Sequence, residues 1–247
     1  MSLDTKWQLL AEQIARAEPR PSFWLRDDDA IAPTPALDKL LQLTEHNDVP
    51  VALAVIPALA GQPLVARLAG SAGACPVVHG WAHANHAPGD SKKQELGLHR
   101  PLPAVVKELA DARQRMEDLF GSRHLAMLVP PWNRIAPELP PLLAQLGYRA
   151  LSAFGSAAPA ASVTVVNTQL DIMNWRGNRG CRDHGEMIDE LAGLIQRHAD
   201  DGAPIGVLTH HLVHDDAAWD FLQQLFEATA GHWVSAADAI SLAEARR

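Results

Sequence analysis

Short apolar runs alternate with stretches of helical periodicity along almost the whole chain. Most of the runs are four to six residues long and rich in Val, Leu and Ala, as in VALAVI at residues 51–56. Between them, apolar residues recur every three or four positions, which predicts amphipathic helices. This alternation is typical of an α/β protein with a mainly parallel sheet.

The pattern predicts seven or eight strands, at residues 23–26, 51–56, 76–79, 125–129, 150–153, 168–172, 205–209 and a short 233–234. It predicts helices at residues 3–17, 35–46, 62–68, 103–120, 137–146, 185–199, 216–228 and 235–246. About seven strand–helix repeats in one chain favour a (β/α) barrel over an open doubly wound sheet, which usually carries a Gly-rich phosphate turn. The irregular segments 79–100, 155–162 and 176–183 are predicted to be functional loops. Because no linker or repeat interrupts the pattern, we expect residues 1–247 to form a single domain.

Composition narrows the function classes. The 247 residues are 47% hydrophobic and 20% charged, and 21 Lys+Arg against 29 Asp+Glu give a net charge of −8. No segment concentrates the basic residues, so we expect no nucleic-acid partner. The apolar runs are too short to span a membrane, and the N-terminus carries no signal-peptide pattern, so we expect a cytoplasmic protein. Two cysteines without Cys-x-x-Cys spacing argue against a thiolate zinc cage, whereas twelve histidines are numerous for a chain of this length. A metal would therefore be held by His and carboxylate.

Polar residues gather where the predicted strands end. Such clusters stand at residues 26–29, 79–86, 130–134, 171–175 and 209–211. In a parallel barrel the carboxyl ends of the strands share one rim, where active sites lie. We therefore expect these distant segments to meet in one pocket.

Two of these clusters have the chemistry of a metal site. Asp27, Asp28 and Asp29 are adjacent carboxylates that repel one another unless a cation or protons intervene, although a solvated helix-capping turn is the alternative. His79 and His83 are spaced to chelate from one loop, with surface histidines as the alternative. Two imidazoles and one carboxylate leave open positions, as in catalytic metal centres.

Hydrolysis at such a site also needs a base and an acid. Asp28 or Asp27 fits the base and His210 fits the acid, although His210 and His211 are also explained as packed barrel residues. Trp81, Trp132 and Trp175 stand in three rim loops and could form an apolar or sugar-stacking wall, or simply pack in the core.

With these residues in view, the chain resembles the polysaccharide deacetylase (NodB-homology) superfamily of carbohydrate esterase family 4. The resemblance implies a distorted (β/α)7-type barrel with a His-His-Asp metal site. The family motif Thr-Phe-Asp-Asp-Gly aligns on residues 25–30 (LRDDDA), which makes Asp28 the catalytic base and Asp29 a metal ligand; a one-residue slip would name Asp27 and Asp28. The motif His-Thr/Ser-x-x-His matches residues 79–83 (HGWAH), which makes His79 and His83 the other ligands.

The remaining motifs are kept in part. Arg-x-Pro-x-Gly corresponds to residues 129–133 (VPPWN), so that Pro131, Trp132 and Asn133 line the substrate site while Val129 replaces the Arg beside the base. Arg26 or Arg134 could substitute for that Arg. Asp-x-x-Asp-Trp corresponds to residues 171–175 (DIMNW), with Asn for the second Asp, and Leu-x-His to residues 208–210, which makes His210 the general acid.

The resemblance implies a metal-dependent amide hydrolase that removes an acyl group from an N-acetylated sugar or a related small amide. Ligand softness favours Zn, with Fe, Mn or Co as alternatives, over Mg. The changed motifs leave open a cyclic-amide or ureide hydrolase of the same fold. Outside that class stand a catalytically silent glycan-binding module and a metal-free enzyme that uses Asp28 and His210. The sequence does not reveal the oligomeric state.

Overall fold

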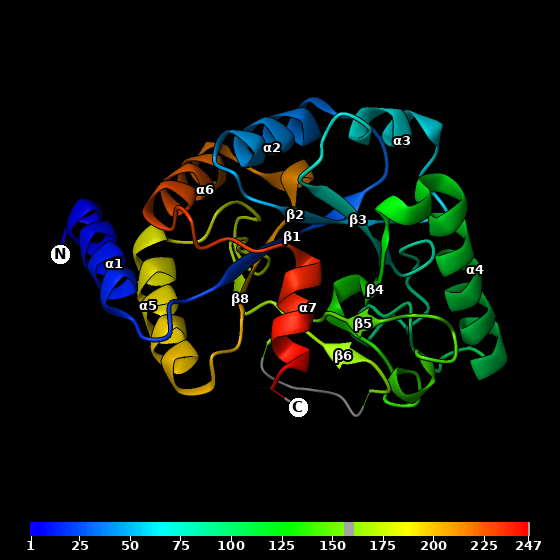
Figure 1. Ribbon diagram of the computed structural model, residues 1–247. Helices are drawn as coiled ribbons and strands as arrows, with labels where there is room; N and C mark the ends of the chain where they lie inside the picture. Colours follow the sequence, from blue (N-terminus) through cyan, green and yellow to red (C-terminus); the bar gives the residue numbers. More distant parts are fainter. Residues whose placement is uncertain (156–160, 247) are drawn as a thin grey trace. The chain divides into compact units, whose positions relative to one another are not determined.

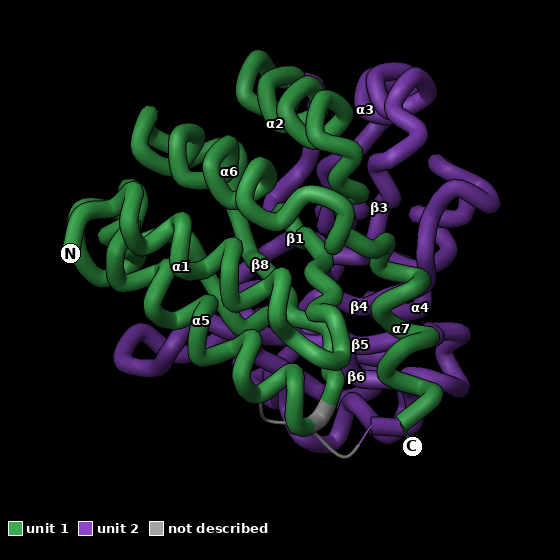
Figure 2. Tube along the Cα trace, turned by 60° about the vertical axis from the view of Figure 1, so that its left-hand side comes forward, with its two compact units in different colours: residues 1–27, 34–51, 168–247 green, residues 28–33, 52–167 purple. Residues whose placement is uncertain are grey.

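The computed structural model describes residues 1–155 and 161–246 (Figure 1). The chain forms two compact units, each assembled from separate stretches of sequence (Figure 2). Unit 1 comprises Met1–Asp27, Thr34–Val51 and Thr168–Arg247, and unit 2 comprises Asp28–Pro33 and Ala52–Asn167. That residues 1–247 act as one domain stays a prediction.

Unit 1 is a parallel sheet with helices. Its strands follow the order β1-β8-β7, in which Phe23 pairs with Ile205 and Leu170 with Val207. Helix α1 packs against α5. The strands are β1 (Phe23–Ala30, of which the last three residues belong to unit 2), β7 (Leu170–Asp171) and β8 (Ile205–Thr209). The helices are α1 (Leu3–Arg16), α2 (Pro35–His46), α5 (His184–Asp201), the 3₁₀ turn η4 (His211–Val213), α6 (Asp216–Ala228) and α7 (Ala236–Glu244).

Unit 2 is also a parallel sheet with helices. Its strands follow the order β6-β5-β4-β3-β2, and His79, the last residue of β3, pairs with Val129, the last residue of β4. This register brings the loops that follow β3 and β4 side by side. The strands are β2 (Val51–Val55), β3 (Ala74–His79), β4 (Leu125–Val129), β5 (Ala150–Leu151) and β6 (Thr164–Val165). The helices are α3 (Gln62–Leu68), α4 (Leu102–Phe120) and the 3₁₀ turns η1 (Gly121–Arg123), η2 (Pro131–Asn133) and η3 (Pro140–Leu142).

Local sequence explains where these elements begin. The side chains of Ser2, Thr34, Asp183, Asp215 and Ser235 each accept a backbone N–H in the first turn of the helix that follows them. The central strands are buried over almost their whole length, as parallel strands covered on both faces must be. Both units therefore have the α/β architecture predicted from the sequence.

The helix predicted at residues 137–146 is wrong. Only the 3₁₀ turn η3 forms there, because Pro140 and Pro141 have no backbone N–H and cannot continue an α-helix. The predicted strand 150–153 is shortened to β5, the strand β6 was not predicted, and residue 233 forms an isolated bridge with Phe23 instead of a strand. The predicted loop 155–162 lies partly outside the described residues.

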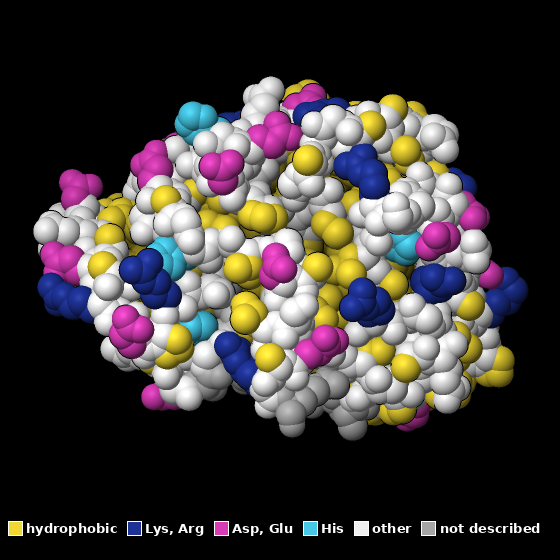
Figure 3. All heavy atoms as spheres, viewed as in Figure 1, with side chains coloured by type: hydrophobic (Ala, Val, Ile, Leu, Met, Phe, Trp, Pro, Cys, Tyr) yellow, Lys and Arg dark blue, Asp and Glu magenta, His cyan; other side chains and the backbone are white. Residues whose placement is uncertain are grey.

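Charges of both signs are interspersed over the face drawn in Figure 3, so that face carries no large patch of one charge. Among the described residues, no helix combines the length and apolar character needed to cross a membrane.

Candidate metal centre and active site

His79 stands at the end of β3 with its orientation set by the backbone of β4. The imidazole is fully buried, and its Nδ1 lies 3.0 Å from the carbonyl oxygen of Val129. A carbonyl oxygen only accepts, so Nδ1 carries the proton and donates it. In the neutral ring this leaves the lone pair on Nε2, the arrangement typical of a metal-ligating histidine.

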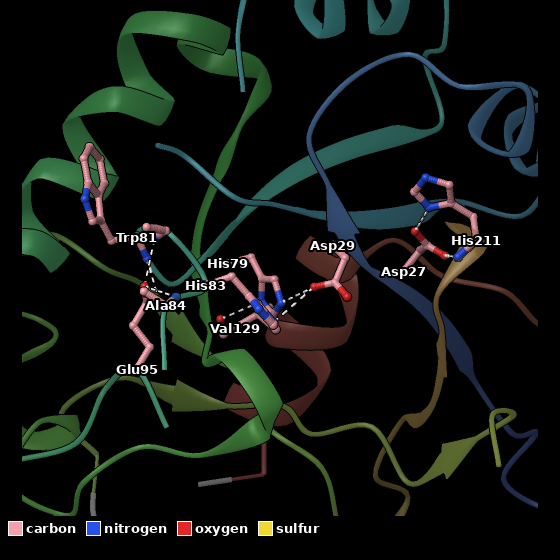
Figure 4. Close-up of polar contacts among 10 residues, drawn as sticks. Asp27, Asp29, His79, Trp81, His83, Ala84, Glu95, Val129 and His211 are labelled. Atoms are coloured by element: carbon pink, nitrogen blue, oxygen red, sulfur yellow. Dashed lines mark hydrogen bonds and ion pairs between the residues drawn. The ribbon is translucent and has the colours of Figure 1, made fainter. Parts of the chain in front are cut away.

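Asp29 and His83 direct polar atoms at the same point (Figure 4). Asp29 Oδ1 lies 3.1 Å from His79 Nε2 and 3.3 Å from His83 Nε2. One ligand atom from each of the three residues lies within 4.8 Å of the other two. Asp29 at φ 74° and His83 at φ 55° have left-handed backbones, which are rare outside glycine and cluster at functional sites.

The donor set fits a divalent metal ion. Two imidazole nitrogens and a carboxylate oxygen are ligands that zinc and its first-row neighbours accept, and three protein ligands leave coordination positions open. Lone pairs about 3 Å apart repel each other unless a proton or a cation lies between them. A metal ion bound by these three residues would satisfy all three atoms at once.

Asp28 lies close enough to this group to influence it electrostatically. Burial lowers the pKa of His79, but the negative charges of Asp28 and Asp29 and the hydrogen bonds to Asp29 and Val129 together outweigh burial, so that the pKa is raised overall. Burial and the neighbouring His79 lower the pKa of His83. The Asp28 side chain is itself only 2% exposed, so Asp28 is a buried carboxylate beside the two histidines.

Trp132 covers one side of the metal-binding group. Its ring centroid lies 4.3 Å from that of His83, and Lys93 Nζ lies 5.9 Å from the Trp132 ring. Trp132 and Asn133 both have left-handed backbones after the buried Pro131. The loop after β4 thus places Trp132 against His83, a candidate metal ligand.

Of the other predicted residues in unit 2, Trp81 and Arg134 have different surroundings. The Trp81 indole points away from the two imidazoles (Figure 4), and its backbone N–H takes part in a loop contact. Arg134 donates Nη1 to the carbonyl oxygen of Lys93 at 2.8 Å, which ties together the loops after β3 and β4.

In unit 1, His210 follows β8 and contacts Trp175. The two ring centroids lie 4.6 Å apart in an edge-to-face arrangement. Trp175 is 41% exposed and donates Nε1 to Asp171 Oδ2 at 2.8 Å. Asn174 accepts the backbone N–H of Gly177, so it shapes its own loop.

Asp27 belongs to a separate buried pair. Its Oδ1 lies 2.5 Å from His211 Nδ1 and its Oδ2 accepts the backbone N–H of His211 at 2.8 Å (Figure 4). The two side chains are 0% and 1% exposed. Both carboxylate oxygens of Asp27 are therefore engaged with the residue next to His210. Arg26, in the same strand, is also fully buried.

Glu95 was missed by the sequence analysis. It is fully buried, and its carboxylate accepts backbone N–H groups from the loop that carries His83. In the sequence it follows Lys92, Lys93 and Gln94, a polar stretch typical of a solvated loop. No local pattern distinguishes this carboxylate from a surface one, since its partners are backbone amides.

No family model and no sequence of a curated protein matches this chain. Solved structures do resemble it. A Mycobacterium smegmatis protein assigned to the polysaccharide deacetylases has a TM-score of 0.62, 16% identity, and a match covering 85% of this chain and 77% of that one. A family 4 carbohydrate esterase from Streptomyces lividans, solved in complex with acetate, has a TM-score of 0.56, 15% identity and coverage of 87% and 91%. A family 4 acetyl xylan esterase from Clostridium thermocellum, solved with a cobalt ion, has a TM-score of 0.52, 16% identity and coverage of 89% and 90%.

At these identities the likeness concerns the fold. The chain has the fold of the polysaccharide deacetylases, which confirms the α/β, distorted-barrel architecture expected from the resemblance of its motifs.

Proposed function

We propose that this chain is a metal-dependent hydrolase of the deacetylase type that removes an acetyl or related acyl group from an N-acetylated sugar or a small amide. The observation that carries the proposal is the convergence of Asp29, His79 and His83 within a polysaccharide deacetylase fold. The acetate complex of the Streptomyces esterase and the cobalt ion of the Clostridium esterase support both the reaction and the metal requirement.

Asp29, His79 and His83 would hold the metal ion. Zinc is the first choice, with iron, manganese or cobalt as alternatives, because two imidazoles are poor ligands for magnesium. When bound, the metal supplies Lewis acidity toward the acyl oxygen and lowers the pKa of a water molecule. The bond from His79 Nδ1 to Val129 supports this role by holding the ring with Nε2 toward Asp29.

Asp28 and His210 would move the protons. As the general base, Asp28 accepts the proton of the attacking water. Its electrostatic influence on His79, together with the engagement of both Asp27 oxygens by His211, supports this assignment over Asp27. As the general acid, His210 donates a proton to the departing nitrogen, and its ring contacts Trp175 edge to face. Trp132, packed on His83, would border the bound acyl group.

The substrate we propose is a small one. The residues that differ from the family motifs are Val129, in place of the Arg beside the base, and Asn174, in place of the second Asp of its motif, whereas Asp29, His79 and His83 match the motifs. Changed motifs together with an unchanged metal-binding group support a different substrate for the same reaction. The cytoplasmic localisation stays a prediction.

The test begins with the metal content of the purified protein. We expect about one metal ion per chain by elemental analysis, lost in His79→Ala and in His83→Ala and retained in His99→Ala, which removes an exposed histidine of the same unit. Release of acetate from a panel of N-acetylated sugars and small amides then identifies the substrate. Asp28→Asn should keep the metal and lose turnover.

Three results would each overturn this proposal in a different way. No metal after reconstitution, with turnover that chelators leave unchanged, would identify a metal-free acid–base enzyme. Metal and glycan binding without turnover of any acylated compound would identify a binding module. Hydrolysis confined to cyclic amides or ureides would identify the other reaction of this fold.

A further inference from the structure

A fully buried carboxylate lies beneath the loop that carries His83. Glu95 Oε1 accepts the backbone N–H groups of Ala82 at 2.8 Å and Ala84 at 3.1 Å, and Oε2 accepts that of Trp81 at 3.0 Å (Figure 4). A buried charge is costly unless hydrogen bonds satisfy it. Here a single side chain receives three charge-assisted hydrogen bonds, which are stronger than bonds between neutral groups.

These bonds surround one metal-binding residue. Ala82 and Ala84 are the two chain neighbours of His83, and both donate to the same oxygen of Glu95. His83 lies between them with φ 55°, a backbone conformation that persists only where its surroundings enforce it. The carboxylate of Glu95 therefore binds the backbone on both sides of His83.

Gly80 makes room for the same carboxylate. A Cβ atom at Gly80 would lie 2.0 Å from Glu95 Oε2 and 2.6 Å from Pro131 Cγ, far inside contact distance. Only glycine at this position lets Glu95 approach the backbone directly after His79. Glu95 thus contacts the loop along its length, from the residue beside one histidine to the residues on both sides of the other.

We propose that Glu95 is a positioning residue that holds the backbone of residues 80–84 so that His83 Nε2 faces Asp29 and His79 before the metal ion binds. Glu95 need not touch the metal or the substrate. The inference rests on the metal site of the proposed function. It explains why the loop has a defined conformation although the backbone of His83 is in the left-handed region.

Three variants separate this role from simple stability. Glu95→Ala removes all three acceptor contacts. Glu95→Gln keeps the shape but replaces one oxygen with an N–H₂ group, which cannot accept, so that either Trp81 or the Ala82–Ala84 pair loses its acceptor. The matched control is Tyr148→Phe, which removes another buried hydrogen bond of unit 2, from the Tyr148 hydroxyl to the carbonyl oxygen of Leu109 in α4.

The first readout uses the metal-free protein. Amide hydrogen exchange measured by NMR at Trp81, Ala82 and Ala84 should be slow in wild type and in Tyr148→Phe and fast in Glu95→Ala. The second readout is cobalt(II) affinity, measured by competition with a chelator together with the visible absorption spectrum of the bound ion. We expect affinity to fall about 10- to 100-fold in Glu95→Ala, as for other residues that support metal ligands, and less in Glu95→Gln. Tyr148→Phe should bind cobalt like wild type.

Protected loop amides in Glu95→Ala, or an unchanged cobalt affinity and spectrum, would overturn the positioning role. If Glu95→Ala does not fold, the same comparison is made with Glu95→Gln. Amide exchange rates and a cobalt affinity equal to those of wild type in Glu95→Gln would also overturn the positioning role. If wild type binds no metal, the proposed function fails, whereas exchange in the metal-free variants still decides whether Glu95 orders the loop.

Discussion

Replacing Asp27 with alanine is expected to destabilise the protein severely without removing a catalytic group. The Asp27 side chain is fully buried, and its two oxygens engage the Nδ1 and the backbone N–H of His211 at 2.5 and 2.8 Å. In Asp27→Ala both donors remain buried and lose their acceptor. The perturbation therefore acts on the stability of unit 1.

The magnitude follows from these two bonds. A buried donor left without its acceptor costs about 1–3 kcal/mol, and breaking a buried ionisable pair costs about 3–5 kcal/mol. We expect the free energy of unfolding to fall by about 4 kcal/mol, a large part of the roughly 5–15 kcal/mol available to a typical domain. Asp27→Asn retains one acceptor and should cost about half as much, since only one of the two contacts is lost.

The assay is urea denaturation followed by circular dichroism, with turnover measured on the folded fraction. Asp118→Ala, an exposed carboxylate on α4, serves as the control and should change the free energy of unfolding by less than about 0.5 kcal/mol. Folded Asp27→Asn should retain turnover, whereas folded Asp28→Asn should have none.

Two results would refute this reasoning. A loss of less than about 1 kcal/mol in Asp27→Ala would mean that the Asp27–His211 pair does not stabilise the fold. A fully stable, inactive Asp27→Asn beside an active Asp28→Asn would make Asp27 the base, the assignment given by the one-residue slip of the first motif.

Three further predictions concern pH, metal and aromatic contacts. Burial lowers the pKa of His214 to about 4 from 6.5. Between these pH values the unfolded chain binds a proton at His214 that the native chain does not. The free energy of unfolding should therefore fall by about 3 kcal/mol as the pH drops from 6.5 to 4. His214→Gln should flatten this part of the pH profile in urea titrations, and a profile unchanged by the substitution would contradict the assignment. Zinc at about 100 times its dissociation constant should stabilise wild type by about 2.7 kcal/mol in thermal melts and leave Asp29→Asn unaffected, whereas equal shifts would argue against the site. Trp132→Ala, which removes the ring packed on His83, should lower kcat/KM for acetate release by about 2- to 12-fold, and an unchanged value would exclude Trp132 from the site.

Periodicity located most of the elements because hydrophobic patterning reflects burial. The helices α2, α3 and α6 begin and end where the sequence predicts, with Thr34 and Asp215 as caps for two of them. The pattern failed where backbone chemistry or pairing overrides it. Pro140 and Pro141 prevent the helix expected at residues 137–146. Strand β6 has two residues, too few for any alternation to register, and only its pairing with β5 reveals it.

The residue types of the candidate metal centre were predictable from the sequence. The structure shows that the three residues lie close together. His79 and His83 share one loop, so their spacing alone suggests chelation, and the structure adds Asp29 from a strand fifty residues away. The sequence does not show which role each of the three consecutive aspartates has, because the role depends on the direction in which each side chain points. Asp27 and Asp29 differ by only two positions, yet Asp27 engages His211 and Asp29 meets the two histidines.

By itself the sequence determined the α/β class, the segments that end at polar residues and the set of residues able to hold a metal, because burial and ligand chemistry are properties of residue type and spacing. The tertiary structure alone decided that Glu95 is buried beneath the loop of His83 and that Gly80 leaves space for it. Those roles depend on backbone amides and on empty space, and neither is encoded in the identity of any single residue.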